Sequence, residues 1–198
     1  MRHFRPPNCR RSVYQIYEAL NFCGVPIGFV TEEQIAAEGV EAYDCLITGG
    51  ARTLLTDSAQ AIREFKNRGG RLVFYGKDNF IEDEYGRSAE PVTPASVIPA
   101  NLTGEPLRDR FSEELAQAGI VPRFTLGDGE DGTVYGVEWR DAQLGPRGLL
   151  NVVNHMRHDV EVRLPEGVWR DLIRDEPASG KLTLKPNQPH LFERIARD

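Results

Sequence analysis

The sequence predicts an α/β domain with an open parallel sheet, followed by a small antiparallel all-β sandwich domain. Residues 43–76 have the pattern of a strand, a crossover helix and a parallel strand, and helix and strand patterns alternate from residue 12 onward. Such alternation is typical of a parallel sheet with helices on its faces. From about residue 121 the apolar period becomes two, with turn residues at regular intervals, which is typical of an all-β domain. We therefore expect domains over residues 12–120 and 121–198.

The central unit justifies the parallel sheet. Residues 44–48 form a short apolar run that ends in two glycines, as a strand buried on both faces does. Thr56 or Asp57 can cap the following helix, and a second pair of glycines can close it. Residues 71–75 then return as a strand. Since parallel strands cannot be joined by a tight turn, the helix serves as the crossover.

The N-terminal part predicts two helices and one strand. Residues 12–15 form a capping box, and apolar residues at helical spacing follow up to Leu20. Residues 25–30 (VPIGFV) have the pattern of a short buried strand, and a second capping box at residues 31–34 opens a short helix.

Residues 1–11 carry four arginines, two prolines and no acidic residue. They are either a basic arm or a frayed or cut end of the chain. Because a doubly wound domain usually begins with a strand that feeds its first helix, and residues 1–11 show no strand pattern, we expect the chain to start just after the first strand of a longer protein.

Prolines interrupt residues 88–106, where only residues 97–98 suggest a strand, and a helix follows from Leu107 to Ala118. In the second domain a glycine-rich turn is expected at residues 127–132 and another at residues 145–148. The expected strands are residues 123–126, 134–139, 148–154, 160–164, 169–173, 181–184 and 190–194.

The composition excludes several classes of protein. The net charge of -6 argues against a nucleic-acid-binding protein, and no apolar run approaches a membrane span. The N-terminus lacks the apolar core of a signal peptide, so we expect a cytoplasmic protein. The three cysteines at wide spacing fit neither a disulfide framework nor a zinc site. No phosphate-binding glycine motif follows a strand, so no nucleotide cofactor is expected.

Candidate reactive residues have simpler interpretations. Cys45 lies within an expected strand and is interpreted as core packing rather than as a nucleophile. His155 and His158 fall in an expected hairpin turn without further ligands, so no metal site is predicted. Trp139 and Trp169 lie on expected strands and are interpreted as core or interdomain residues rather than sugar platforms.

The acidic loop at residues 77–87 follows a parallel strand at its carboxyl end, where open α/β sheets bind ligands. Its carboxylates suit calcium or sugar hydroxyls, although the calcium-loop spacing is missing, and the alternative is a solvated acidic loop. The candidate ligand or subunit contacts are Arg52, Asp78, Asn79, Asp83 and Glu84.

The order of these segments resembles a known family. Residues 13–35 (VYQIYEALNFCGVPIGFVTEEQI) and 43–76 are similar to the glutamine-amidotransferase-like trimerisation domain of family 42 glycoside hydrolases, which are β-galactosidases. Residues 149–193 resemble the small β-sandwich that closes those enzymes, through the Gly-x-Leu-x-Leu-x-Pro run at residues 180–186. The resemblance implies a class I amidotransferase-like, flavodoxin-like first domain.

The resemblance also implies where catalysis occurs. In the family, two glutamates on a (β/α)8 barrel act as acid/base and nucleophile, and no barrel fits in this chain. The implied role is therefore a non-catalytic oligomerisation region, without catalytic residues, metal or cofactor. Its implied partners are a catalytic barrel and further copies of the chain, forming a trimer. Two alternatives stay open: a stand-alone amidotransferase-like hydrolase, and a carbohydrate-binding module on the β domain.

Overall fold

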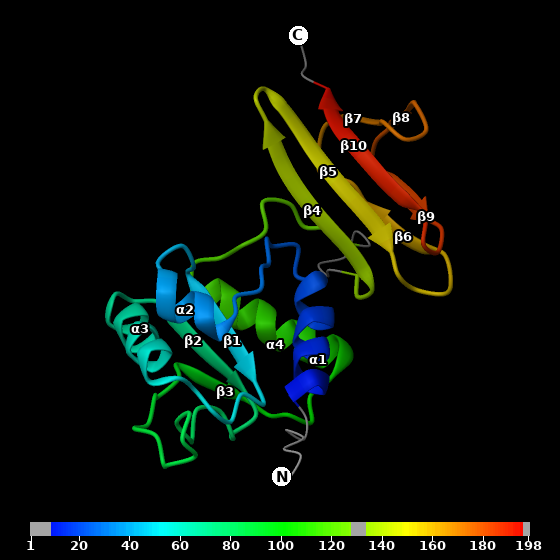
Figure 1. The fold of residues 1–198 in the computed structure, drawn as a ribbon. Helices are drawn as coiled ribbons and strands as arrows, with labels where there is room; N and C mark the ends of the chain where they lie inside the picture. Colours follow the sequence, from blue (N-terminus) through cyan, green and yellow to red (C-terminus); the bar gives the residue numbers. More distant parts are fainter. Residues whose placement is uncertain (1–8, 128–133, 196–198) are drawn as a thin grey trace. The chain divides into compact units, whose positions relative to one another are not determined.

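The computed structural model describes residues 9–127 and 134–195, which form two compact units (Figure 1). The first unit contains a parallel sheet with helices and comprises residues up to Ala19 together with Ile27–Ile120. The second contains antiparallel sheets and comprises Leu20–Pro26 together with the residues from Val121 onward. The expected combination of a parallel α/β part and an antiparallel part is confirmed. Most of the expected basic arm, residues 1–8, lies outside the described residues.

The first unit contains a three-stranded parallel sheet in the order β1-β2-β3, as expected from the crossover pattern. In the register, Ile47 lies opposite Val73, and Val73 lies opposite Ser96. The elements are α1 (Cys9–Asn21), α2 (Glu32–Glu38), β1 (Cys45–Gly49), α3 (Thr56–Asn67), β2 (Arg71–Tyr75), β3 (Ser96–Ile98) and α4 (Gly104–Gln117).

Two helix starts differ in how they are capped. At α2 the predicted capping box is confirmed: Gln34 N donates to Thr31 Oγ1 at 3.3 Å, and Thr31 N donates to Gln34 Oε1 at 2.9 Å. At α3 the predicted cap is wrong, because Leu55 is the N-cap and makes no side-chain cap bond. Carboxylates from elsewhere take that role, since Glu32 accepts from Leu55 N and Glu84 accepts from Thr56 N. Negative groups are favoured at this positive helix end.

The strand expected at residues 25–30 is wrong. Residues 26–31 have no strand assignment and appear in no ladder or bridge of the described chain. The segment is apolar as the pattern indicates, but a strand also needs a neighbour for its backbone groups. Val30 nevertheless packs against the first core, whose buried residues are Ile35, Val40, Leu46, Leu54, Ala59, Ile62, Phe65, Leu72, Phe74, Phe80 and Val92.

The second unit has a five-stranded sheet in the order β4-β5-β10-β7-β8 and a two-stranded sheet of β6 and β9. Its named strands pair antiparallel, and an isolated parallel bridge joins Asn154 and Pro186. The strands are β4 (Val137–Leu144), β5 (Arg147–Asn154), β6 (Val160–Arg163), β7 (Val168–Asp171), β8 (Glu176–Ala178), β9 (Lys181–Leu184) and β10 (Pro189–Ile195).

The sequence patterns missed two features of this unit. Residues 123–126 form no strand, although Phe124 and Leu126 pack into the core and the adjacent Gly127 forms an isolated bridge with Arg163. β8 was not expected, since its short Glu-Pro-Ala sequence has no alternation; it pairs only with β7, and proline is tolerated on such an edge. The hairpin at residues 145–148 is confirmed, with Gly145 at φ 58° between β4 and β5. Most of the turn expected at residues 127–132 lies outside the described residues.

Candidate functional site

The carboxyl edge of the parallel sheet is formed by two interlocked loops, one after β1 and one after β2. Phe80 N donates to Ala51 O at 2.8 Å, Ile81 N donates to Arg52 O at 2.8 Å, and Leu54 N donates to Glu82 O at 3.0 Å. The predicted contact residues Arg52, Asp78, Asn79, Asp83 and Glu84 all belong to these two loops.

Asn79 is buried at this edge and holds the two loops together. Its Oδ1 accepts from Ala51 N at 3.1 Å, and its Nδ2 donates to Gly76 O at 3.0 Å. The next residue, Phe80, is in the left-handed region at φ 57° and packs edge-on against Phe74 with ring centroids 5.2 Å apart. The amide of Asn79 therefore satisfies backbone groups that the sharp turn of the chain leaves unpaired.

The charged side chains of these loops pair within the chain. Arg52 Nη2 lies 2.6 Å from Glu82 Oε1, and this hydrogen bond lowers the pKa of Glu82. Partial desolvation would raise the pKa of Asp83, but hydrogen bonds from the backbone and side chain of Arg87 and from Tyr85 N together lower it.

Glu84 completes this network by binding the start of α3. Its carboxylate accepts from Thr56 N and from the Thr56 hydroxyl, each at 3.1 Å. Arg52, Asn79, Asp83 and Glu84 thus position the loops, and their role as ligand or subunit contacts stays a prediction. The described residues contain no group of three or more His, Cys, Asp or Glu side chains that could hold a metal ion.

Cys45 on β1 is a free thiol beside a buried ion pair. Burial raises its pKa to about 11, despite the opposing charge of Arg71, which lies opposite it in the register. Arg71 Nε binds the fully buried carboxylate of Glu114 on α4 at 2.8 Å. A thiol with this pKa is protonated at neutral pH and is a poor nucleophile.

Both tryptophans lie in the core of the second unit, which agrees with the first of the two interpretations offered for them. Trp139 donates its Nε1 hydrogen to Phe124 O at 3.0 Å, and Trp169 donates to Pro165 O at 2.9 Å. Neither tryptophan presents a ring face to solvent for a sugar.

The two histidines of the expected hairpin turn make separate contacts. His155 Nε2 lies 2.9 Å from Glu138 Oε2, and the backbone O of His158 accepts from Asn154 at 2.9 Å.

A buried polar group that the sequence analysis missed joins β7 to β10. Asp171 Oδ2 lies 2.7 Å from His190 Nδ1 and 2.9 Å from Arg174 Nη1, and its Oδ1 accepts from Ile173 N at 2.9 Å. Burial would raise the pKa of Asp171, but the hydrogen bonds from His190, Ile173 and Arg174 outweigh it and lower the pKa. Ile173 and Arg174 are close to Asp171 in the sequence, but His190 lies 19 positions away on another strand, and no spacing motif could have paired it with Asp171.

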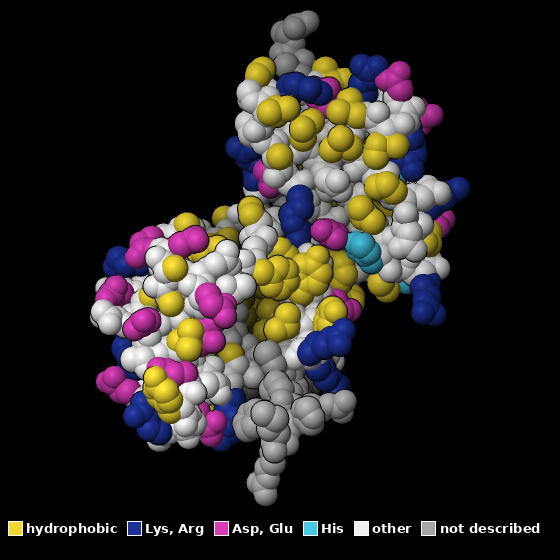
Figure 2. All heavy atoms as spheres, viewed as in Figure 1, with side chains coloured by type: hydrophobic (Ala, Val, Ile, Leu, Met, Phe, Trp, Pro, Cys, Tyr) yellow, Lys and Arg dark blue, Asp and Glu magenta, His cyan; other side chains and the backbone are white. Residues whose placement is uncertain are grey.

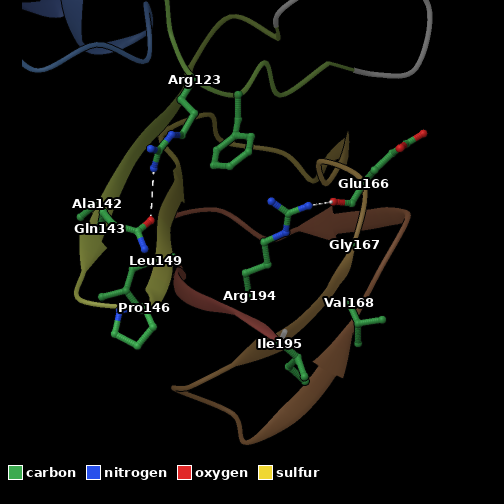
Figure 3. A pocket seen from close by; sticks show the side chains of 12 residues that line it. Arg123, Ala142, Gln143, Pro146, Leu149, Glu166, Gly167, Val168, Arg194 and Ile195 are labelled. Atoms are coloured by element: carbon green, nitrogen blue, oxygen red, sulfur yellow. Dashed lines mark hydrogen bonds between the residues drawn. The ribbon is translucent and has the colours of Figure 1, made fainter. Parts of the chain in front are cut away.

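The second unit also has an open pocket of about 720 Å³ (Figure 3). The guanidinium of Arg194 occupies its middle and donates to Glu166 O at 3.2 Å, while Arg123 donates to Gln143 Oε1 at 3.3 Å on the opposite wall. Its lining residues are Arg123, Phe124, Ala142, Gln143, Pro146, Gly148, Leu149, Glu166, Gly167, Val168, Arg194 and Ile195.

Comparisons with known proteins give a fold match. No protein-family model and no curated protein sequence matches this chain. The structure is similar to an apo exo-carrageenase of glycoside hydrolase family 42 from Bacteroides ovatus, with 22% identity and a TM-score of 0.68. It is also similar to a family 42 β-galactosidase from G. stearothermophilus (16% identity, TM-score 0.72) and to a β-galactosidase from Bacillus circulans sp. alkalophilus (14% identity, TM-score 0.71).

These matches cover nearly all of this chain but only a part of each enzyme. They cover 93%, 96% and 95% of this chain, but only 26%, 37% and 38% of the respective enzymes. The chain thus spans well under half the length of the enzymes that it matches. The resemblance expected from the sequence is confirmed at the level of fold: nearly the whole chain has the fold of one part of family 42 glycoside hydrolases.

Proposed function

We propose that this chain is a non-catalytic region of a β-galactosidase-like glycoside hydrolase assembly, in which it holds a catalytic (β/α)8 barrel and further copies of itself together. The carrying observation is that nearly all of this chain matches only 26% to 38% of each enzyme. The first unit then corresponds to an amidotransferase-like trimerisation domain, and the second to a closing β-sandwich. A cytoplasmic location is part of the same proposal; none of the described helices is long and apolar enough to cross a membrane.

Exposed apolar side chains on the first unit support an assembly role. On and beside α1, Tyr14 is 60% exposed, Phe29 is 68% exposed, and Val13 and Tyr17 are each 40% exposed. Figure 2 shows hydrophobic side chains gathered over the part of the first unit where α1 lies. Contiguous apolar surface of this kind marks sites of interaction between proteins.

The two alternative functions have less support. A cysteine hydrolase needs an activated thiolate, but the pKa of Cys45 is raised to about 11. A carbohydrate-binding module built on the tryptophans needs exposed rings, but Trp139 and Trp169 are buried.

Two measurements on the purified chain test the proposal. Sedimentation velocity over a hundredfold range of concentration should show self-association, and incubation with a nitrophenyl β-galactoside should release no nitrophenol. Tyr14→Ser should weaken association at least about tenfold, because a buried tyrosine contributes strongly to an interface. Tyr85→Ser, which alters an exposed tyrosine in the acidic loop, serves as the matched control.

The outcomes separate the possibilities. Hydrolysis of the galactoside by the purified chain would refute the non-catalytic role. A monomer at every concentration would refute self-assembly. If Tyr85→Ser weakens association and Tyr14→Ser does not, the subunit contact lies at the acidic loop and not at α1.

A further inference from the structure

The pocket of the second unit lies where the core face of the five-stranded sheet ends (Figure 3). Gln143 on β4 lies opposite Gly148 on β5, and a Cβ added to Gly148 would lie 3.6 Å from Arg194 Cβ on β10. Because side chains on one face of a strand recur every second residue, Gly148 and Arg194 continue the face that carries the core residues Leu150 and Phe192. At this end of the sheet, polar residues and a glycine replace the apolar core and leave the hollow of about 720 Å³.

Gly148 leaves the floor of the pocket open without being required there by the backbone. It is not in the positive-φ region, and the register of β4 and β5 is unbroken beside it, so neither a left-handed turn nor a bulge explains it. An added Cβ would meet ordinary contacts, 3.6 Å from Arg194 Cβ and 3.8 Å from Gln143 Oε1. Glycine weakens a strand and often marks a place where a ligand approaches the backbone closely.

The polar groups that line the pocket offer more free donors than acceptors. A guanidinium carries five N–H donors. Within the described chain Arg194 donates one hydrogen bond, to Glu166 O at 3.2 Å, and Arg123 donates one, to Gln143 Oε1 at 3.3 Å. The amide nitrogen of Gln143 is occupied by Gly145 O at 2.8 Å. A ligand that satisfies the remaining donors must therefore be rich in acceptor oxygens.

The charge of these donors is only partly balanced. Asp141 Oδ2 lies 3.7 Å from Arg123 Nη1. Arg194 forms no ion pair with any residue of the described ranges, and its guanidinium carbon lies 6.0 Å from the centroid of the Trp169 ring. The carboxylate of Glu166 points away from Arg194 in Figure 3. The planar fork of a guanidinium matches an oxyanion, which can accept two parallel hydrogen bonds from it.

Apolar side chains complete the walls of the pocket, among them Phe124, Pro146 and Leu149. Phe124 is held in place by Trp169, which meets it edge-on with ring centroids 5.8 Å apart. A volume of about 720 Å³ is in the range of small-molecule sites, which combine apolar walls with a few placed polar groups. An inorganic anion would leave most of this space and all of the apolar wall unused.

We propose that this pocket binds a small organic anion, whose carboxylate or sulfate group pairs with Arg194 and Arg123 and whose ring-shaped body packs on Phe124 and Leu149 above Gly148. The pocket belongs wholly to the second unit. The inference therefore goes beyond the proposed function and does not depend on it: binding is expected whether or not the chain assembles.

A titration of the intact chain tests the proposal, followed through the NMR signals of the Gly148 and Gly167 amides. The probes are galacturonate and benzoate, which carry a carboxylate, and galactose 6-sulfate. Galactose and benzyl alcohol are the matched neutral compounds, and inorganic sulfate is the anion without a body. At least one organic anion should bind about tenfold or more tightly than its neutral counterpart and than inorganic sulfate. The preferred probe identifies the anionic group and the kind of ring.

Variants separate the charge from the space. Arg194→Gln keeps an amide donor but removes the charge, and it should weaken binding of that anion about tenfold or more. Arg170→Gln is the matched control, because this arginine of β7 is also exposed, pairs with Asp175 and lies outside the pocket lining; it should change the affinity less than about twofold. Gly148→Val should fill the floor and abolish binding. Denaturant unfolding should show that this variant is at least as stable as wild type, since valine favours a strand.

Several results would overturn the proposal. Equal affinity for inorganic sulfate would reduce the pocket to an exposed cation that holds an adventitious ion only. No preference for any of the three organic anions over its neutral counterpart would remove the role of the guanidinium groups, and so would unchanged affinity in Arg194→Gln. Retained binding in Gly148→Val would show that the floor is not the site, and a loss of stability in that variant would explain the glycine by packing instead.

Discussion

Replacing Asp171 by alanine should destabilise the second unit by about 3 kcal/mol, since hydrogen bonds to a buried charged group contribute roughly 1.5–3 kcal/mol each and several are lost together. The carboxylate binds His190 Nδ1 at 2.7 Å, Arg174 Nη1 at 2.9 Å and Ile173 N at 2.9 Å. Loss of a partner in a buried pair typically costs about 3–5 kcal/mol. We expect a loss at the lower end of this range of free energies, because Arg174 is partly exposed and can turn toward water.

The effect should depend on pH in a defined direction. The folded-state pKa of Asp171 is lowered below its ordinary value of 3.8. A lowered folded pKa stabilises the protein fully above the unfolded value, and that stability is lost as the pH falls through the folded value. The difference in the free energy of unfolding between wild type and Asp171→Ala should therefore be largest near neutral pH and should shrink below pH 3.8.

Denaturant unfolding followed by tryptophan fluorescence measures this difference. The chain has two tryptophans, and Trp139 and Trp169 both lie in the second unit, so the signal reports that unit alone. Glu161→Ala serves as the control, because it breaks an exposed pair with Lys181 and should cost less than about 1 kcal/mol. Equal losses in both variants, or a difference that does not change with pH, would refute the reasoning.

Three further predictions concern other positions. Cys45, whose pKa is raised to about 11, should react with iodoacetamide at pH 8 about 100-fold more slowly than a thiol with the ordinary pKa of 9.0. Site-resolved mass spectrometry measures this rate, and fast labelling would contradict the burial of the thiol. Gly24→Ala should destabilise the second unit by about 2 kcal/mol or more in the same fluorescence assay. Gly24 has φ 67°, and a Cβ added there would lie 2.2 Å from Trp139 Cε2. An unchanged free energy of unfolding would show that the Trp139 ring can shift. Arg52→Ala should leave the thermal unfolding midpoint nearly unchanged, since its pair with Glu82 is exposed. A clear drop in the midpoint would show that this pair stabilises the two loops.

Local patterns predicted several regular elements of the first unit, but the capping box expected at residues 12–15 is wrong, because α1 already begins at Cys9. Three features were predicted from the sequence because they depend on neighbouring residues: the crossover unit, the Thr31 capping box and the short strand near residues 97–98. The start of α3 was not readable, because the groups that bind it are Glu32 and Glu84, more than twenty residues away on either side.

The candidate residues lie in two neighbouring loops, because the carboxyl ends of neighbouring parallel strands meet at one edge, and their role as contacts stays a prediction. Their use of one another as partners could not be predicted. Arg52 pairs with Glu82 across thirty positions, and Asn79 binds Ala51 N across 28. The buried group of Asp171 and His190 is a stronger example, since it depends on the pairing of β7 with β10.

By itself, the sequence determined the alternation of helices and strands, the change of period near residue 121 and the apolar character of VPIGFV, because these depend on short-range spacing. Only the tertiary structure decided which of these segments are paired. Backbone hydrogen bonding in a sheet requires two strands, so the same apolar pattern gives β1 a ladder with β2 and leaves residues 26–31 and one edge of β1 without one among the described residues.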